Sequence, residues 1–277
     1  MTLTIAILPD MEKASVVPAT RIALVVEYDG TDYYGFQFQA DRPTVQSELE
    51  QAILSLTGER TRVTAASRTD TGVHALGQVV SFRTSSHLPL HNFVSGLNFY
   101  LPAAIAVKAA YRQQTGFHVQ RTAVSRQYDY HILNTSNRSP LRERFSYLVP
   151  EALNITTMQK ACQSLIGEHD FASFTSGTGN LIKNTVRTVY QAGIRRDSDL
   201  VIFTIVANSF LTHQVRNTVG ALIKVGLDKI SPEEFYSIIE RKKPGLAGPK
   251  APASGLYLVK VNYPQSFKEE TNENIQY

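Results

Sequence analysis

The sequence is poor in the residues that form disulfides and cysteine-rich metal sites. Its 277 residues include one cysteine, Cys162, and no tryptophan. A single cysteine excludes an intrachain disulfide and a cysteine-rich zinc site. Cys162 falls in the helical pattern 158–166, where we expect a small core residue rather than a nucleophile. The seven histidines are scattered along the chain, so we expect no metal site.

The usual cofactor and nucleophile motifs are also missing. The chain has no GxxxxGK[ST] phosphate loop, GxGxxG fingerprint, HExxH zinc motif or GxSxG nucleophile elbow. It has no run close to the roughly 20 apolar residues of a membrane helix. The N-terminal segment lacks a basic start and contains Asp10 and Glu12, unlike a signal peptide. We therefore expect a cytoplasmic protein without membrane contact, and any reaction here would use no nucleotide, metal or thiol.

Composition and charge describe a folded chain with a mild preference for polyanions. Hydrophobic residues make up 43% and charged residues 19%, which is enough for one large domain or two small ones. The net charge is +4, and basic residues concentrate in the stretches 121–144, 183–196 and 241–243. Such clusters suit a phosphate-binding face. Solvated surface charge explains them about equally well.

Apolar periodicity predicts a mixture of strands and helices. Strand patterns occur at 21–28, 62–67, 77–84, 104–112, 123–133 and 255–263, with a hairpin at 184–209. Helical patterns occur at 44–58, 90–101, 156–167, 211–226 and 232–243. This order predicts an α+β fold of two similar halves, each a mostly antiparallel sheet with helices on one face. We expect a disordered tail at 1–20, domains at 21–118 and 119–265, and a polar tail at 266–277.

The polar stretch SRTDTGVHALGQ, residues 67–78, is the strongest candidate for a catalytic loop. Arg68 stands two residues from Asp70, and a nearby cation favours the ionised carboxylate. An ionised carboxylate serves as a nucleophile or cation stabiliser rather than as a general acid. Gly72 permits a sharp backbone path. The alternative is an ordinary polar turn with a surface ion pair, which the pattern alone favours.

Two further stretches combine charge with apolar patterning. Alternation along the predicted strand 123–133 places Arg126, Tyr128 and Tyr130 on one face. That face suits a phosphate and a stacked base, but tyrosines packed in the core would give the same pattern. Arg216 lies within an apolar helical pattern, and a buried arginine needs a partner. Asp70 is a candidate for that partner.

Taken together, these stretches resemble the tRNA pseudouridine synthases that modify the anticodon stem-loop. The family pattern around the catalytic aspartate is AGRTDAGVHAxGQV, and residues 66–79 read ASRTDTGVHALGQV. The resemblance extends over nearly all of 21–264, through YDGTDYYGFQFQ, TVQSELE, RQYDY, GEHDFASF, FLTHQVRNTVG and APASGLYL. The chain departs from the family at Ser67, Thr71, Gln214 and Phe36, where glycine, alanine, methionine and tryptophan are usual. None of these changes removes a group that the mechanism needs.

The resemblance implies a role for each candidate residue. Asp70 is the catalytic carboxylate, and Arg216 holds it by an ion pair. Arg68 pairs with Asp70 and fills the space left by a flipped nucleotide. Tyr128 packs against the target uracil. The RNA-binding residues that the resemblance implies are Arg68, Phe117, His118, Arg121, Arg126, Lys183 and Arg187.

The implied activity is isomerisation of uridine to pseudouridine at positions 38, 39 and 40 of tRNA. The family is homodimeric, and the resemblance implies two sheets joined across a central RNA-binding cleft. Substrate and product are isomers, so we expect no cofactor and no metal. Asp70 could attack the base, attack the sugar or remove the C2′ proton, and the sequence leaves these routes open.

Two rival functions have less support. A tRNA-binding module without turnover would not need the carboxylate of Asp70 together with Arg68, Tyr128 and Arg216. Another base-modifying enzyme, such as a deaminase or a methyltransferase, would need metal ligands or a cofactor loop that the sequence lacks.

Overall fold

The computed structural model describes residues 19–114, 116–175 and 184–264. The tail expected at 266–277 lies outside these residues, as does all but the end of the tail expected at 1–20. No helix in the described part of the chain has the length and apolarity needed to cross a bilayer.

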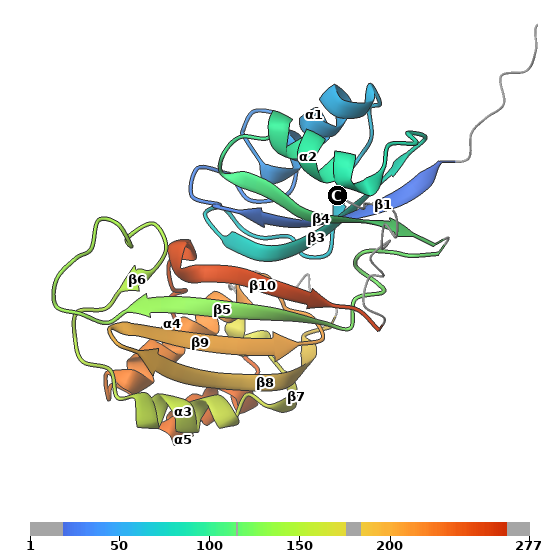
Figure 1. Ribbon diagram of the computed structural model, residues 1–277. Helices are drawn as coiled ribbons and strands as arrows, with labels where there is room; N and C mark the ends of the chain where they lie inside the picture. The colour runs from blue at the N-terminus through green and yellow to red at the C-terminus, as the bar shows by residue number, and fades with distance from the viewer. Residues whose placement is uncertain (1–18, 115, 176–183, 265–277) are drawn as a thin grey trace, which may run out of the picture.

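The strands of the described residues form one sheet in the order β4-β1-β3-β10-β5-β9-β8-β7 (Figure 1). Two short strands extend it, because β2 pairs with β3 and β6 pairs with β5. Pairing is antiparallel except between β10 and β3 and between β5 and β6. The strands are β1 (Thr20–Tyr28), β2 (Thr64–Ala65), β3 (His74–Thr84), β4 (Ile105–Gln113), β5 (Ser125–Leu133), β6 (Tyr147–Leu148), β7 (Gly167–Asp170), β8 (Val186–Asp197), β9 (Leu200–Ala207) and β10 (Leu256–Asn262).

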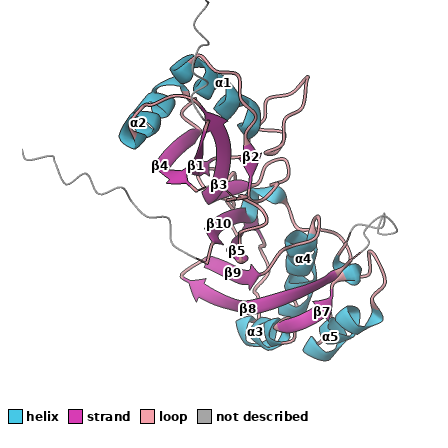
Figure 2. Cartoon of the chain, turned by 90° about the vertical axis from the view of Figure 1, so that its right-hand side faces the viewer, coloured by secondary structure: helices cyan, strands magenta, loops and turns pink. Residues whose placement is uncertain are grey.

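Five α-helices in the described residues lie in two groups (Figures 1 and 2). The helices are α1 (Val45–Thr57), α2 (Leu90–Tyr100), α3 (Ile155–Gln163), α4 (Gln214–Gly226) and α5 (Pro232–Arg241). α1 packs against α2, which contacts β4, whereas α3 contacts α4, α5 and β8. The structure therefore confirms an α+β fold with a mostly antiparallel sheet.

Local sequence signals explain where several helices begin and end. Thr44 accepts a hydrogen bond from the Ser47 N–H and caps α1, which ends at Gly58 in the left-handed conformation. Ser231 and Glu234 form the reciprocal capping box of α5. Both helices therefore begin and end within two residues of the positions expected from the sequence.

β10 lies in the middle of the sheet and joins β4, β1 and β3 on one side to β5, β9, β8 and β7 on the other. It runs parallel to β3, with Tyr257 opposite His74, and antiparallel to β5 on its other side. Gly77 permits this close approach, because a Cβ there would lie 2.5 Å from the Val259 carbonyl oxygen. Strands from both parts of the chain therefore belong to one continuous sheet.

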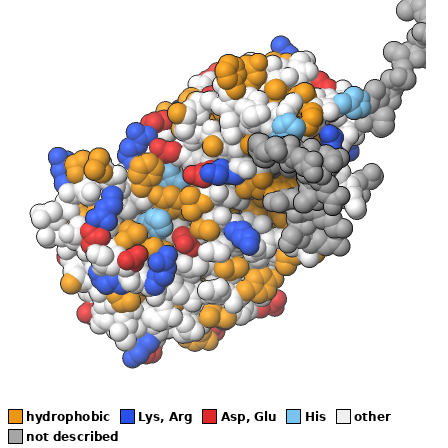
Figure 3. Space-filling model, in the orientation of Figure 1, with side chains coloured by type: hydrophobic (Ala, Val, Ile, Leu, Met, Phe, Trp, Pro, Cys, Tyr) orange, Lys and Arg blue, Asp and Glu red, His pale blue; other side chains and the backbone are white. Residues whose placement is uncertain are grey.

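The core is one hydrophobic cluster that extends across this junction. Cys162 is fully buried within it, and burial raises the pKa of its thiol to about 12. The expectation of a small core residue is confirmed, because a thiol with that pKa is neutral and inert at neutral pH. On the side seen in Figure 3, acidic, basic and apolar side chains are interspersed, so no single sign of charge marks that side.

Candidate active site

Buried side chains form hydrogen bonds with the loop between β2 and β3 and fix its position. The Gln78 amide, fully buried on β3, donates to the Ser67 carbonyl oxygen (2.7 Å) and accepts from the Ser67 N–H (3.3 Å). The hydroxyls of Thr69 and Tyr28 lie 2.7 Å apart. Gly72 has a φ of 76°, which a residue with a Cβ rarely adopts. The loop is therefore built into the sheet rather than being a free surface turn.

The loop presents the Asp70 carboxylate to two groups at the start of α4. Asp70 Oδ2 lies 3.4 Å from Arg216 Nη1 and 3.5 Å from His213 Nε2. Arg216 is 9% exposed, and its Nε donates to the Ala251 carbonyl oxygen at 2.8 Å. The contact suggested by the sequence between Asp70 and Arg216 is thus present. It joins residues 146 positions apart.

His213 was not among the residues that the sequence predicted for the site. It caps α4 with φ 64° and ψ 1°, a left-handed conformation that is costly for a residue other than glycine. Its Nε2 also lies 3.4 Å from Lys250 Nζ. Partial burial lowers the His213 pKa, the Asp70 carboxylate opposes that effect, and Lys250 and Arg216 reinforce it. Its spacing of three residues from Arg216, one helical turn, is the signal that could have found it.

Tyr128 forms a wall beside this carboxylate. The ring is 6% exposed and stands edge-on to Phe210, at a centroid distance of 5.1 Å. Its hydroxyl lies 2.8 Å from Ser67 Oγ. Burial, with the nearby Asp70 charge, raises the Tyr128 pKa to about 12, so the phenol is neutral. Asp70, Tyr128, Phe210 and Leu256 all line a cavity of about 390 Å³, a size that suits a small ligand group.

Arg68 does not pair with Asp70, so that expectation was wrong. In the described residues the cation within ion-pair distance of Asp70 is Arg216, and the imidazole of His213, whose pKa is lowered, lies 3.5 Å from Asp70 Oδ2. The physical reason is that the Arg68 side chain is exposed at the edge of the cavity, where water solvates its guanidinium. It lines the 390 Å³ cavity and two neighbouring ones.

Arg126 is tied into the protein interior. It is 9% exposed, and its guanidinium donates to the carbonyl oxygens of Asn208 and Gln120, both at 2.8 Å. Longer bonds reach Ala66 (3.3 Å) and Ala123 (3.4 Å). We interpret Arg126 as a structural tie between the loop and the start of β5. Contact of Arg126 with RNA stays a prediction.

The other RNA-binding candidates lie on two segments. Phe117 packs against Tyr263, and His118 Nδ1 accepts from the Gln120 and Arg121 N–H groups. Arg121 is exposed. Gln120, in the same turn, lines the 390 Å³ cavity, which brings this segment to the site.

The second segment leads into β8. The Arg187 guanidinium donates to the carbonyl oxygens of Asn184 (3.1 Å) and Val186 (2.6 Å), and burial lowers its pKa. Lys183 lies outside the described residues. The structure does not bring Arg187 into contact with the Asp70 cluster.

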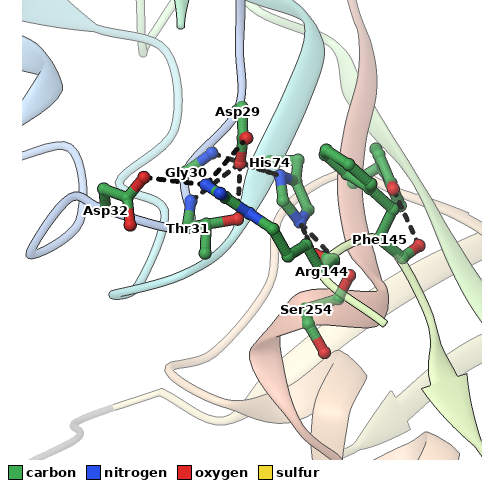
Figure 4. A network of polar contacts seen from close by, with 9 residues as sticks. Asp29, Gly30, Thr31, Asp32, His74, Arg144, Phe145 and Ser254 are labelled. Atoms are coloured by element: carbon green, nitrogen blue, oxygen red, sulfur yellow. Dashed lines mark hydrogen bonds and ion pairs between the residues drawn. The ribbon is translucent and has the colours of Figure 1, made fainter. Parts of the chain in front are cut away.

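A second polar network fixes the end of the loop (Figure 4). His74 Nε2 faces the carbonyl oxygens of Arg144 (3.0 Å) and Ser254 (3.2 Å), which assigns the proton to Nε2. His74 Nδ1 then accepts from the Gly30 N–H at 3.1 Å. The Arg144 guanidinium donates to Asp32 at 2.7 Å. Segments that are distant in the sequence thus meet at His74, to which the sequence analysis gave no role.

Comparison with known proteins finds related proteins that match most of the chain. The family model described as tRNA pseudouridine synthase matches residues 24–120 and 161–264. A protein of Thermoanaerobacter sp. (strain X514) named tRNA pseudouridine synthase A is 42% identical over 243 residues, 88% of this chain and 99% of its own length. A protein of Blochmanniella pennsylvanica (strain BPEN) with the same name is 42% identical over 247 residues, 89% of this chain and 94% of its own length.

Proposed function

Since the chain belongs to the tRNA pseudouridine synthase family, we propose that it isomerises uridine to pseudouridine at positions 38, 39 and 40 of tRNA. One observation carries this proposal. The Asp70 carboxylate, bound by Arg216 and with His213 beside it, lies at a cavity walled by the Tyr128 ring. A carboxylate beside an aromatic wall is the arrangement that a flipped uridine would need.

Asp70 is the reacting group in this proposal. The reaction breaks the N1–C1′ bond, turns the uracil, joins C5 to C1′ and releases the C5 hydrogen to water. The guanidinium of Arg216 donates to Asp70 Oδ2 at 3.4 Å and orients the carboxylate. The carboxylate then attacks the base or the sugar, stabilises positive charge at C1′, or removes the C2′ proton. Each route uses the same ionised oxygen.

The neighbouring side chains position the uridine. Base flipping costs a few kcal/mol, and groups that replace the lost stacking reduce that cost. The neutral Tyr128 ring, fixed by Ser67 and Phe210, packs against the uracil. Arg68, exposed at the rim, enters the RNA in place of the flipped nucleotide.

The proposal includes the finer organisation implied by the family. Two similar halves, residues 21–118 and 119–265, meet at the β3–β10 junction, and tRNA occupies a central cleft between them. Asp70 comes from the first half and Arg216 from the second, so the site is where these halves would meet. The active species is a cytoplasmic homodimer without cofactor or metal.

The decisive experiment measures tritium release from tRNA transcripts that carry 5-tritiated uridine. Wild type should release tritium to water, and Asp70→Asn should release none while keeping its fold and most of its tRNA affinity. Transcripts with cytidine at positions 38, 39 and 40 serve as matched controls, and the wild-type protein should release no tritium from them. Normal release by Asp70→Asn would refute the role of Asp70. Binding without release by wild type would favour a tRNA-binding module.

A further inference from the structure

A second groove opens beside the cavity that holds Asp70. It has a volume of about 260 Å³, and its walls include Phe38, Gln46 and Arg62. Arg68 and Gln120 line both this groove and the 390 Å³ cavity. The groove and the cavity therefore share a wall. An RNA strand that enters one of them lies within reach of the other.

The floor of this groove holds Phe38 in place. The Phe38 N–H donates to the buried Gln46 Oε1 at 2.9 Å. Gln46 Nε2 in turn donates to Glu50 (2.7 Å) and to the Val63 carbonyl oxygen (3.2 Å). Although its backbone is fixed in this way, the Phe38 side chain is 43% exposed. A large apolar ring is thus held at the surface, beside a groove, on a well-connected segment.

A guanidinium lies over this ring. Arg62 Cζ is 5.0 Å from the Phe38 ring centroid, and the Arg62 side chain is 65% exposed. Glu50 Oε2 lies 3.2 Å from Arg62 Nη1 and orients the guanidinium. The groove therefore carries an exposed aromatic ring with a guanidinium stacked over it. Unpaired nucleotides bind to this combination, because the base stacks on the ring and the phosphate pairs with the cation.

We propose that Phe38 and Arg62 bind an unpaired nucleotide of the anticodon loop next to the target uridine. The base of this nucleotide stacks on Phe38, and Arg62 contacts its phosphate. The inference rests on the proposed function for its substrate, a tRNA anticodon stem-loop. The shared wall at Arg68 supports it, since the flipped uridine and its chain neighbour must occupy adjoining spaces.

The first test compares the binding of an anticodon stem-loop RNA by single variants. Phe38→Ala should raise Kd about tenfold, which corresponds to about 1.4 kcal/mol. Phe38→Tyr keeps the ring and should bind like wild type. Phe99→Ala is the matched control, because Phe99 is 81% exposed on α2 and lines neither cavity. Equal Kd values for Phe38→Ala and Phe99→Ala would overturn the proposal.

The second test locates the stacked base. Abasic nucleotides are introduced at one loop position at a time. At one position beside the target, the abasic RNA should weaken binding by wild type but not further weaken binding by Phe38→Ala. The proposal is overturned if the two changes add at every position. Arg62→Gln should lower the salt dependence of log Kd by about one unit of slope, and an unchanged slope would exclude the phosphate contact.

These measurements separate the two proposals. If wild type releases no tritium but Phe38→Ala still binds the RNA about tenfold more weakly, the proposed reaction fails and the nucleotide subsite stands. If wild type releases tritium and Phe38→Ala binds and reacts like Phe99→Ala, the reaction stands and the subsite fails.

Discussion

Replacement of Arg216 by leucine tests the architecture of the site most directly. Arg216 makes two contacts, one to the Ala251 carbonyl oxygen at 2.8 Å and one to Asp70 at 3.4 Å. Arg216→Leu removes both while keeping an apolar stem within α4. The two contacts have different consequences, because the first is buried and the second reaches a carboxylate that is 31% exposed.

The stability change should come mainly from Ala251. Leaving a buried carbonyl oxygen without its partner costs about 1–3 kcal/mol. The ion pair adds little, since water screens a partly exposed carboxylate. We therefore expect a loss of about 2 kcal/mol, which lowers the melting temperature by roughly 4 °C in a protein of this size.

The catalytic change should come from Asp70. Without Arg216 the carboxylate loses a fixed cation and a hydrogen bond, so turnover should fall on the order of 100-fold. Thermal unfolding followed by circular dichroism and tritium release measure the two effects separately. Asp70→Asn is the comparison, because it should abolish release with little change in melting temperature. An Arg216→Leu variant that melts and reacts like wild type would refute this reasoning.

Two further predictions concern aromatic packing and pH. Tyr128→Phe keeps the ring and should retain some tritium release, whereas Tyr128→Leu should lose more, and equal rates would argue against stacking. Burial lowers the pKa of His74 and of His213 below 6.5, so the unfolded chain binds more protons than the folded one as pH falls. Stability should therefore decrease from pH 7 to pH 5. This decrease in melting temperature should be smaller in His74→Asn, and an identical decrease would exclude His74 as a cause.

Local patterns predicted the elements that depend on nearby residues. The expected helix 44–58 is α1 (Val45–Thr57), and the expected hairpin 184–209 is β8 and β9. The expected strand 77–84 begins earlier, at His74, because Tyr257 and Leu258 pair with its first residues. That pairing joins positions far apart in the chain, which periodicity cannot reveal.

In the candidate site, too, local patterns predicted some features, and contacts between distant residues determined the others. The motif at 66–79 and the arginine in an apolar helical pattern suggested the contact between Asp70 and Arg216, which the structure contains. Arg68 was misjudged, since closeness in sequence does not determine which way a loop side chain points. Gln78 was passed over because it resembles an ordinary strand residue, and its clamp on Ser67 exists only in the folded chain.

The central place of β10 has a consequence for how the protein is made. Residues 256–262 fill the gap between β3 and β5, although nearly all the described chain precedes them. A nascent chain on the ribosome can fold its earlier segments first. It cannot complete the sheet, or stack Tyr257 on His74, until this strand has left the exit tunnel. We therefore expect activity towards tRNA to begin only once this strand has paired with β3 and β5.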